Sequence, residues 1–242
     1  MHPGLVCLAL AAALSAPRFE HRVFHAHNGL ALPYRLLRPS TGTRGAPLVL
    51  FLHGAGERGD DNEAQLVHGS GFFQRLAERG AAVVVPQCPA NGWWSNFDWR
   101  KGRMGARPSR AGAAVLQMLG LLARELGSDR DRIYVGGLSM GGFGTFDLVA
   151  RRPNLFAAAF PICGGGDPAT APALKEVPFW VFHGAKDPVV PVQASRSMVE
   201  AIRAAGGDVR YTEYPEAQHD SWTPAFAEPG LIDWLLSQRR KR

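Results

Sequence analysis

The sequence predicts an α/β fold, a mostly parallel central sheet with helices on both faces. Two observations lead to this expectation: short apolar, β-branched runs alternate with helical patterns, and 242 residues with 46% hydrophobic content can bury one sizeable core. The chain has no internal repeat and no low-complexity linker, so a single domain is expected over residues 17–238.

The expected elements follow one another in strand–helix order. Each strand is a short apolar run, and each long helix has apolar residues three and four positions apart. In residues 109–127, one face carries Val115, Met118, Leu119, Leu122 and Leu126, and a glycine ends the helix. Strands are expected at 30–37, 47–54, 81–87, 132–137, 156–162, 178–184 and 209–215. Helices are expected at 71–80, 109–127, 140–153, 193–207 and 230–238.

The two ends of the chain differ in composition from the rest. Residues 5–14 (LVCLALAAAL) are apolar and precede Ser15 and Ala16, which resembles a secretory signal, although no Lys or Arg precedes the run. The run is too short to span a bilayer. We therefore expect a signal peptide at residues 1–16 and a secreted or periplasmic protein, with a cytoplasmic protein as the alternative. Residues 239–242 carry four positive charges and are expected to form a frayed basic tail.

Charge and cysteine content exclude several classes of function. The net charge of +6 comes largely from the tail, and no basic stripe interleaved with aromatic residues suggests a nucleic-acid partner. Cys7 would leave with the signal peptide, and Cys88 and Cys163 are expected to be free thiols, because two cysteines do not form a disulfide framework. Their spacing also does not match a metal site. No metal, no organic cofactor and no stable membrane insertion are expected.

Five glycines surround Ser139 in the stretch GGLSMGGFG, between a predicted strand and a predicted helix. Residues 137–141 fit G-x-S-x-G, the nucleophile elbow, in which a sharp strand-to-helix turn presents the serine hydroxyl. Glycines are expected here because side chains would collide with the neighbouring strand and helix. The free N–H groups of the helix N-terminus would favour developing negative charge. An ordinary glycine-rich turn is the alternative.

A serine hydroxyl needs a base and an orienting acid to become a nucleophile. Asp187 follows the strand at 178–184, and His219 follows the last strand, which matches the chain order Ser, Asp, His of this kind of site. His219 would accept the Ser139 proton and later donate it to the leaving group. Other candidates fit the chain order less well, and these are Asp167, Asp208 and Asp220 as the acid and His183 as the base.

The oxyanion hole is expected to combine two backbone N–H groups. One belongs to the residue after the nucleophile, Met140, and the other to the loop His53-Gly54-Ala55-Gly56 that follows the strand at 47–54. We assign the second donor to Ala55, with Gly56 as the alternative, and expect His53 to brace the loop. Each donor contributes about 3–4 kcal/mol to stabilising the transition state.

Six stretches resemble, in the same order, a carboxylesterase group of α/β-hydrolases: LHGAGERGDDN, VPQCP, GLSMGGFGTF, FPICGGGDP, HGAKDPVVP and HDSW. The group includes feruloyl and acetylxylan esterases, polyhydroxybutyrate depolymerases and peptidases related to prolyl oligopeptidase. The resemblance covers the chain from about Leu30 to the final helix. It implies an α/β-hydrolase fold without a cap domain and a triad of Ser139, Asp187 and His219. Because the group is chemically diverse, it implies the mechanism better than the substrate.

We therefore expect a serine carboxylic-ester hydrolase that acts on a small-molecule or polysaccharide-linked ester. The first alternative is a serine peptidase, which would share every catalytic residue, although no propeller or other domain that would select a peptide terminus is visible. The second is a non-catalytic binding module, which would normally lack one triad member. A dehalogenase would carry Asp in place of Ser139. The sequence leaves the acyl group, the alcohol and the oligomeric state open.

Residues 88–109 follow a strand and are too long for a simple connection, which is typical of functional loops. This segment contains Trp93, Trp94 and Trp99. We expect at least one of them to line the substrate site, with Trp222 beside His219, because a flat indole suits aryl or sugar rings. The alternative is that these rings cover the sheet edge and stabilise the loop.

Overall fold

The computed structural model describes residues 18–98 and 100–240. The signal peptide expected at 1–16, Trp99 and the last two residues of the tail lie outside the described residues, so the signal peptide stays a prediction. Within the described ranges, no helix has both the length and the apolar character needed to cross a bilayer.

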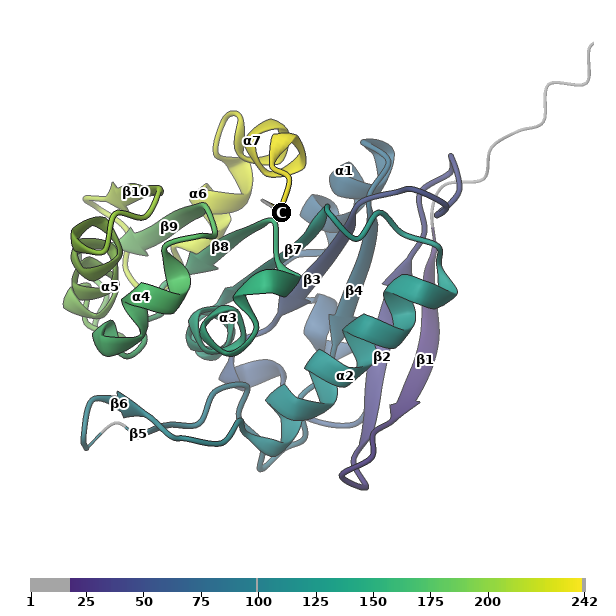
Figure 1. Cartoon of the computed structure of the whole chain (residues 1–242), viewed down its shortest axis with the longest axis horizontal. Coiled ribbons are helices and arrows are strands. Elements are labelled where there is room, and N and C mark those ends of the chain that lie inside the picture. Colours follow the sequence, from purple (N-terminus) through teal and green to yellow (C-terminus); the bar gives the residue numbers. More distant parts are fainter. Residues whose placement is uncertain (1–17, 99, 241–242) are drawn as a thin grey trace, which may run out of the picture.

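One eight-stranded sheet forms the centre of the fold, in the order β1-β2-β4-β3-β7-β8-β9-β10 (Figure 1). All neighbours from β4 to β10 pair in parallel, whereas β1 and β2 are antiparallel at one edge. The expected mostly parallel sheet is therefore confirmed. Its strands are β1 (Phe19–His25), β2 (Ala31–Leu37), β3 (Leu48–Leu52), β4 (Ala82–Pro86), β7 (Ile133–Leu138), β8 (Ala158–Ile162), β9 (Phe179–Gly184) and β10 (Val209–Tyr214).

Helices cover both faces of the sheet, with α2, α3, α4 and α5 on one face and α1, α6 and α7 on the other (Figure 1). Successive residues of a strand point to opposite faces. Leu50 of β3 therefore belongs to the first apolar core and Phe51 to the second. The helices are α1 (Ser70–Glu78), α2 (Arg110–Glu125), α3 (Met140–Arg151), α4 (Ala171–Leu174), α5 (Gln193–Ala204), α6 (Trp222–Ala227) and α7 (Leu231–Ser237).

Several short or polar elements were not expected from the sequence. Strand β1 is an edge strand with polar residues on both sides, and its Glu20 and Arg22 form ion pairs with each other and with Arg38 and Glu125. A search for apolar runs does not detect such a strand. Helix α6 and the small hairpin of β5 (Phe97–Asp98) and β6 (Arg103–Met104) are too short to show a period.

The segment from β8 to β9 contains only short helices, α4 and the 3-10 helix Pro168–Thr170. The chain has no room there for a cap domain, as expected. The prediction of a frayed basic tail does not hold for its first two residues. Arg239 forms an ion pair with Asp129, and Arg240 forms one with Asp131. Two acidic groups on the loop before β7 hold these arginines against the domain.

Helix α3 begins in direct contact with the backbones of β3 and β7. A Cβ atom on Gly141 would lie 1.9 Å from the Leu52 carbonyl oxygen, and one on Gly137 would lie 2.5 Å from the Gly141 carbonyl oxygen. No real Cβ occupies such positions, so both glycines are required by close approach. The collision expected from the sequence is confirmed at these two residues.

We expect Gly141→Ala to lower the free energy of unfolding by about 3 kcal/mol or more, because the added methyl group overlaps a backbone carbonyl. The matched control is Gly120→Ala in the middle of α2, where no atom apart from the helix's own neighbouring backbone lies within 4 Å of the added Cβ. That change should stabilise the protein by about 0.5–1 kcal/mol. Urea unfolding followed by circular dichroism measures both, and equal stabilities would contradict the steric argument.

Candidate active site

Ser139 occupies the turn between β7 and α3 in an unusual backbone conformation, with φ 52° and ψ −115°. A non-glycine residue with positive φ is strained, and such residues gather at functional sites. The Ser139 N–H donates to the Ile162 carbonyl at the end of β8, 2.9 Å away. This hydrogen bond, together with the packing of the first turn of α3 against the sheet, holds the strained turn in place.

The structure brings Ser139, His219 and Asp187 into one hydrogen-bonded line. The His219 Nε2 lies 3.0 Å from the Ser139 Oγ, and the His219 Nδ1 lies 2.8 Å from the Asp187 Oδ2. A carboxylate only accepts, so Nδ1 carries the hydrogen and Nε2 is free to accept the Ser139 proton. The three side chains come from the ends of β7, β9 and β10, which meet at the carboxyl edge of the sheet.

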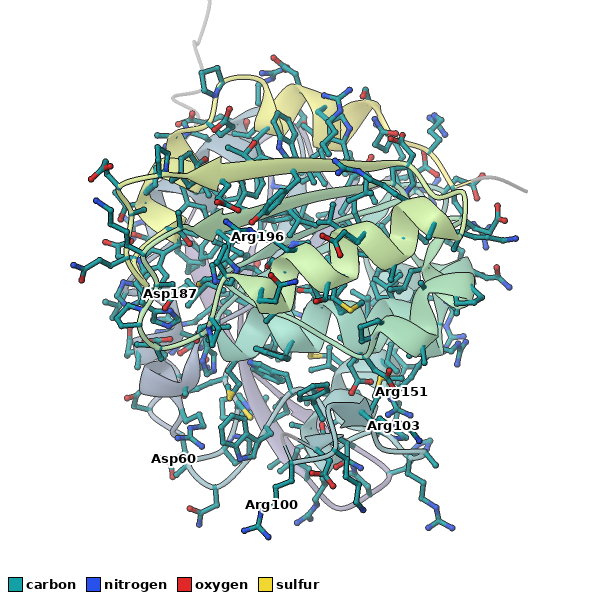
Figure 2. The ribbon with its side chains drawn as sticks, turned by 90° about the vertical axis from the view of Figure 1, so that its left-hand side faces the viewer. Asp60, Arg100, Arg103, Arg151, Asp187 and Arg196 are labelled. Atoms are coloured by element: carbon teal, nitrogen blue, oxygen red, sulfur yellow. The ribbon has the colours of Figure 1, made fainter. Side chains whose placement is uncertain are left out.

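Asp187 is held as a buried carboxylate, and its side chain has no exposed surface. Its Oδ1 accepts hydrogen bonds from the N–H groups of Val189 (2.8 Å) and Val190 (2.9 Å). Burial alone raises the pKa of Asp187, but the hydrogen bonds from His219, Val190 and Val189 outweigh it and hold the pKa below its ordinary value. The residue is therefore ionised where an imidazole needs an acceptor. Figure 2 shows Asp187 on the loop that leads into α5.

The competing candidates have other partners. Asp167 caps a short helix and accepts the Met104 N–H, which ties down the β5–β6 hairpin. Asp220 accepts hydrogen bonds from Thr223. His183 is fully buried and contacts Ser195 and Asp187.

The two expected oxyanion donors lie at helix starts beside Ser139. Ala55 begins a 3-10 helix (Ala55–Glu57) and Met140 begins α3, so neither N–H has a partner within its own helix. A Cβ on Gly54 would lie 3.7 Å from the Ser139 Cβ, which shows how closely this loop approaches the serine. The geometry suits two N–H groups that converge on the oxygen of the carbonyl that Ser139 would attack.

Two buried aromatic side chains brace residues 53–56 (the expected oxyanion loop), as expected for His53. The His53 Nε2 accepts the Cys88 N–H (2.9 Å), and its Nδ1–H donates to the Gly54 carbonyl (2.6 Å). The Trp94 indole N–H donates to the His53 carbonyl (3.0 Å). Burial lowers the pKa of His53 to about 4, so the ring is neutral and can accept at Nε2.

The tryptophans of the long loop occupy different environments. Trp94 has no exposed surface, so it cannot contact a substrate; the expectation of a pocket wall is wrong for this residue, because its ring fills the space under the oxyanion loop. Trp93 is 46% exposed and lines a cavity of about 580 Å³ that also reaches Met140, Phe97 and Phe143. Trp222 places its ring perpendicular to His219, with centroids 5.5 Å apart.

Anchors for the long loop were not found from the sequence. On α3, Asp147 accepts hydrogen bonds from Ser95 and the Asn96 N–H, and Arg151 donates to the carbonyls of residues 105 and 106. Arg58 donates to the Ala55 carbonyl, and its guanidinium lies over the Trp93 ring, 5.1 Å from the centroid. These contacts join distant parts of the chain and leave no pattern in the sequence. In Figure 2, Arg100 and Arg103 mark the outer end of this loop.

Cys163, Asp187 and His219 form the one group of side chains in the described ranges whose spacing could suit a metal ion, with the ligating atoms within 4.8 Å of one another. Asp187 and His219 are already hydrogen-bonded to each other. Burial raises the pKa of the Cys163 thiol, which disfavours the thiolate that a metal needs. Cys88 and Cys163 are both free, as expected.

Comparison with protein families identifies the family of this chain. Residues 40–228 match the family model described as phospholipase/carboxylesterase. Among solved structures, a thermostable esterase is 40% identical and superposes with a TM-score of 0.84 over 92% of this chain and 63% of its own. An acylaminoacyl peptidase of Pyrococcus horikoshii is 18% identical, with a TM-score of 0.71, over 95% of this chain and 43% of its own, and shares the fold.

Curated relatives agree with the family match. A bifunctional acetylxylan esterase/xylanase of Neocallimastix patriciarum is 26% identical over 76% of this chain. A poly(3-hydroxyalkanoate) depolymerase of Paucimonas lemoignei is 34% identical over 52% of this chain. The chain spans only 26% and 30% of the length of these two proteins. An acyl-protein thioesterase of Neurospora crassa is 26% identical over 84% of this chain and 91% of its own.

We expect the protein to lose stability as the pH falls from about 6.5 to about 4, in part because His53 is buried as a neutral base. In this window the unfolded chain binds a proton at His53 and the folded chain does not, so the free energy of unfolding rises with pH and falls on acidification. The difference between the ordinary pKa of about 6.5 and the folded-state pKa of about 4 corresponds to about 3 kcal/mol of unfolding free energy.

The measurement is urea unfolding at several pH values between 7 and 4 for the wild type and for His53→Gln, whose amide does not titrate. The variant should show a smaller loss on acidification. Identical pH dependence in the two proteins would contradict a neutral buried His53.

Proposed function

Because this chain belongs to the phospholipase/carboxylesterase family of α/β-hydrolases, we propose that it cleaves carboxylic esters through an acyl-enzyme formed on Ser139. The observation that carries the proposal is the continuous line from Ser139 through His219 to Asp187, with donor–acceptor distances of 3.0 and 2.8 Å. This is the arrangement in which an imidazole activates a serine hydroxyl.

In acylation, the Ser139 Oγ attacks the ester carbonyl carbon while its proton moves to His219 Nε2. The carbonyl oxygen becomes an oxyanion, and the N–H groups of Ala55 and Met140 stabilise it. Asp187 stabilises the imidazolium and holds Nδ1–H in place. The tetrahedral intermediate then collapses: the bond to the alcohol breaks, and the alcohol leaves with the proton from His219.

In deacylation, a water molecule takes the place of the alcohol. It gives a proton to His219 Nε2 as its oxygen attacks the acyl carbon, and a second oxyanion forms between the same two N–H groups. The bond to the Ser139 Oγ breaks, the Oγ recovers the proton, and the carboxylic acid leaves. No metal or organic cofactor takes part in this sequence.

The substrate is proposed to be an ester with a planar or ring-shaped group beside the scissile bond. The supporting feature is the cavity next to Met140, with Trp93, Phe97 and Phe143 in its wall. Arg58 lies over Trp93 and limits its rotation, which leaves an oriented, exposed indole. Trp222 is proposed to close the opposite side, beside His219. The likeness to peptidases at 18% identity concerns the fold, so nothing favours peptide bonds over esters.

We expect Ser139→Ala and His219→Ala each to lower kcat for 4-nitrophenyl acetate by about 10⁴ to 10⁶, because each removes the unit that forms the acyl-enzyme. The double variant should be little worse than either single one. Labelling by an organophosphonate, which needs an activated serine, should occur in the wild type and in neither variant.

Two results would contradict this proposal. Losses that multiply in the double variant would mean that the two residues do not act as a unit. A wild type that cleaves peptide anilides faster than aryl, acetyl and feruloyl esters would replace the ester proposal by a peptidase.

We expect Trp93→Ala to lower kcat/KM for 4-nitrophenyl benzoate about 10- to 100-fold more than for 4-nitrophenyl acetate, because one ring contact corresponds to about 1–3 kcal/mol. The control is Trp93→Phe, which keeps a flat ring and should retain most of the difference. Equal losses on both esters together with a lower Tm would show that Trp93 serves the fold alone.

A further inference from the structure

We propose that His183 is a positioning residue for the catalytic pair, because its Nε2–H lies between the Val190 carbonyl and the same Asp187 oxygen that receives the His219 N–H. The proposal rests on the proposed function, since the position of Asp187 matters to catalysis only if His219 is the base. It gives a role to a histidine that chain order alone assigns to the framework.

His183 lies near the end of β9, four residues before Asp187, and has no exposed surface. Its Nε2 is 3.2 Å from the Asp187 Oδ2 and 3.0 Å from the Val190 carbonyl oxygen. Its Nδ1 is 2.7 Å from the Ser195 Oγ on α5. The ring therefore has a polar partner at each nitrogen and stands between α5 and the loop that carries Asp187.

The chemistry of these partners fixes the hydrogen at Nε2. A carboxylate oxygen and a backbone carbonyl are both pure acceptors, so the nitrogen that faces them must be the donor. Ser195 can serve as donor or acceptor at Nδ1. Burial lowers the pKa of His183, which favours the neutral ring. The single Ser195 hydroxyl hydrogen has two acceptors within reach, the His183 Nδ1 at 2.7 Å and the Gly164 carbonyl at 2.9 Å.

Asp187 is therefore surrounded by four N–H groups in a fixed arrangement. Its Oδ1 accepts from the backbone of Val189 and Val190, its Oδ2 accepts from the His219 ring, and the His183 Nε2 lies 3.2 Å from the same Oδ2. Rotation of the carboxylate would break at least two of these bonds. His183 is thus the group that prevents Oδ2 from moving away from the His219 Nδ1–H, and it shares the negative charge that His219 faces.

Without the His183 donor, two changes follow. The Asp187 Oδ2 can shift relative to His219, which lowers kcat. The carboxylate also presents more negative charge to the imidazole, so the acid limb of the kcat/KM profile moves to higher pH. The titratable groups around this pair, from every neighbouring element, are His219, Asp220, Cys163 and Glu213. His183 makes no contact with the cavity, so KM should change little.

The test compares His183→Leu, which removes the donor, with His183→Gln, which keeps an N–H of similar reach. The matched control is Val181→Ala, a buried change two residues earlier on the same strand β9, which reduces packing but leaves Asp187 untouched. Activity on 4-nitrophenyl acetate is divided by the fraction of protein that an organophosphonate labels, so partly unfolded protein does not count.

We expect His183→Leu to lower kcat per labelled site about 10- to 100-fold, as for loss of one hydrogen bond to a charged group, with KM within about twofold. The acid limb should move to higher pH, and His183→Gln should restore part of both effects. The proton resonance of the His219 Nδ1–H should shift in His183→Leu and stay in place in Val181→Ala. If His183→Leu does not fold, Ser195→Ala should change the same quantities in the same direction by a smaller amount.

Unchanged kcat per labelled site, an unchanged pH profile and an unmoved resonance in His183→Leu would overturn the proposal and leave His183 as a framework residue. Equal effects of His183→Leu and Val181→Ala would do the same. Failure of the proposed function is recognised separately: the wild type would then neither take up the organophosphonate nor cleave the ester. In that case the His219 resonance still reports whether His183 holds Asp187.

Discussion

The close approach of three backbones at the start of α3 is the constraint on which the rest of the structure depends. Gly141 contacts the Leu52 carbonyl of β3, and Gly137 contacts the first turn of the helix, so α3 sits directly on the centre of the sheet. This contact forces the turn at Ser139 into its strained conformation and aims the first N–H groups of the helix at the carboxyl edge. One steric condition thus accounts for both the half-buried Ser139 and the helix start beside it.

The remaining parts of the site come from loops that end at the same edge, and each loop is held by hydrogen bonds to the framework. The loop after β3 is fixed by His53, which accepts the Cys88 N–H, and by the Trp94 indole. Both rings are buried, so their polar atoms must find partners inside the protein. These hydrogen bonds fix the loop in place, which is what a preorganised oxyanion donor on it would require.

The protonation states of the site also depend on burial and on the hydrogen bonds that offset its cost. Asp187 has no exposed surface, and a buried carboxylate persists as an anion only when donors surround it. Two backbone N–H groups and the His219 ring donate to it, and the His183 Nε2 lies 3.2 Å from its Oδ2. His53 and His183 remain neutral for the opposite reason, because burial penalises their charged forms. Of the three rings, His219 has the largest exposed part, and its Nε2 faces the Ser139 Oγ.

The sequence by itself was sufficient to predict the parallel sheet and the line of Ser139, Asp187 and His219. Both rest on local rules: apolar runs mark buried strands, and the elbow and strand ends fix where side chains emerge.

Tertiary structure alone decided what depends on contacts between distant residues. The neighbours Trp93 and Trp94 have the same side chain, yet only Trp94 reaches the His53 carbonyl and disappears into the core. Likewise Arg239 and Arg240 are ordered by acids more than a hundred residues earlier in the chain, and the second histidine on Asp187 becomes visible only when β9 and α5 are packed together. The local sequence determines the conformation of a segment. Whether a side chain is buried or paired depends on which other residues the folded chain brings into contact with it.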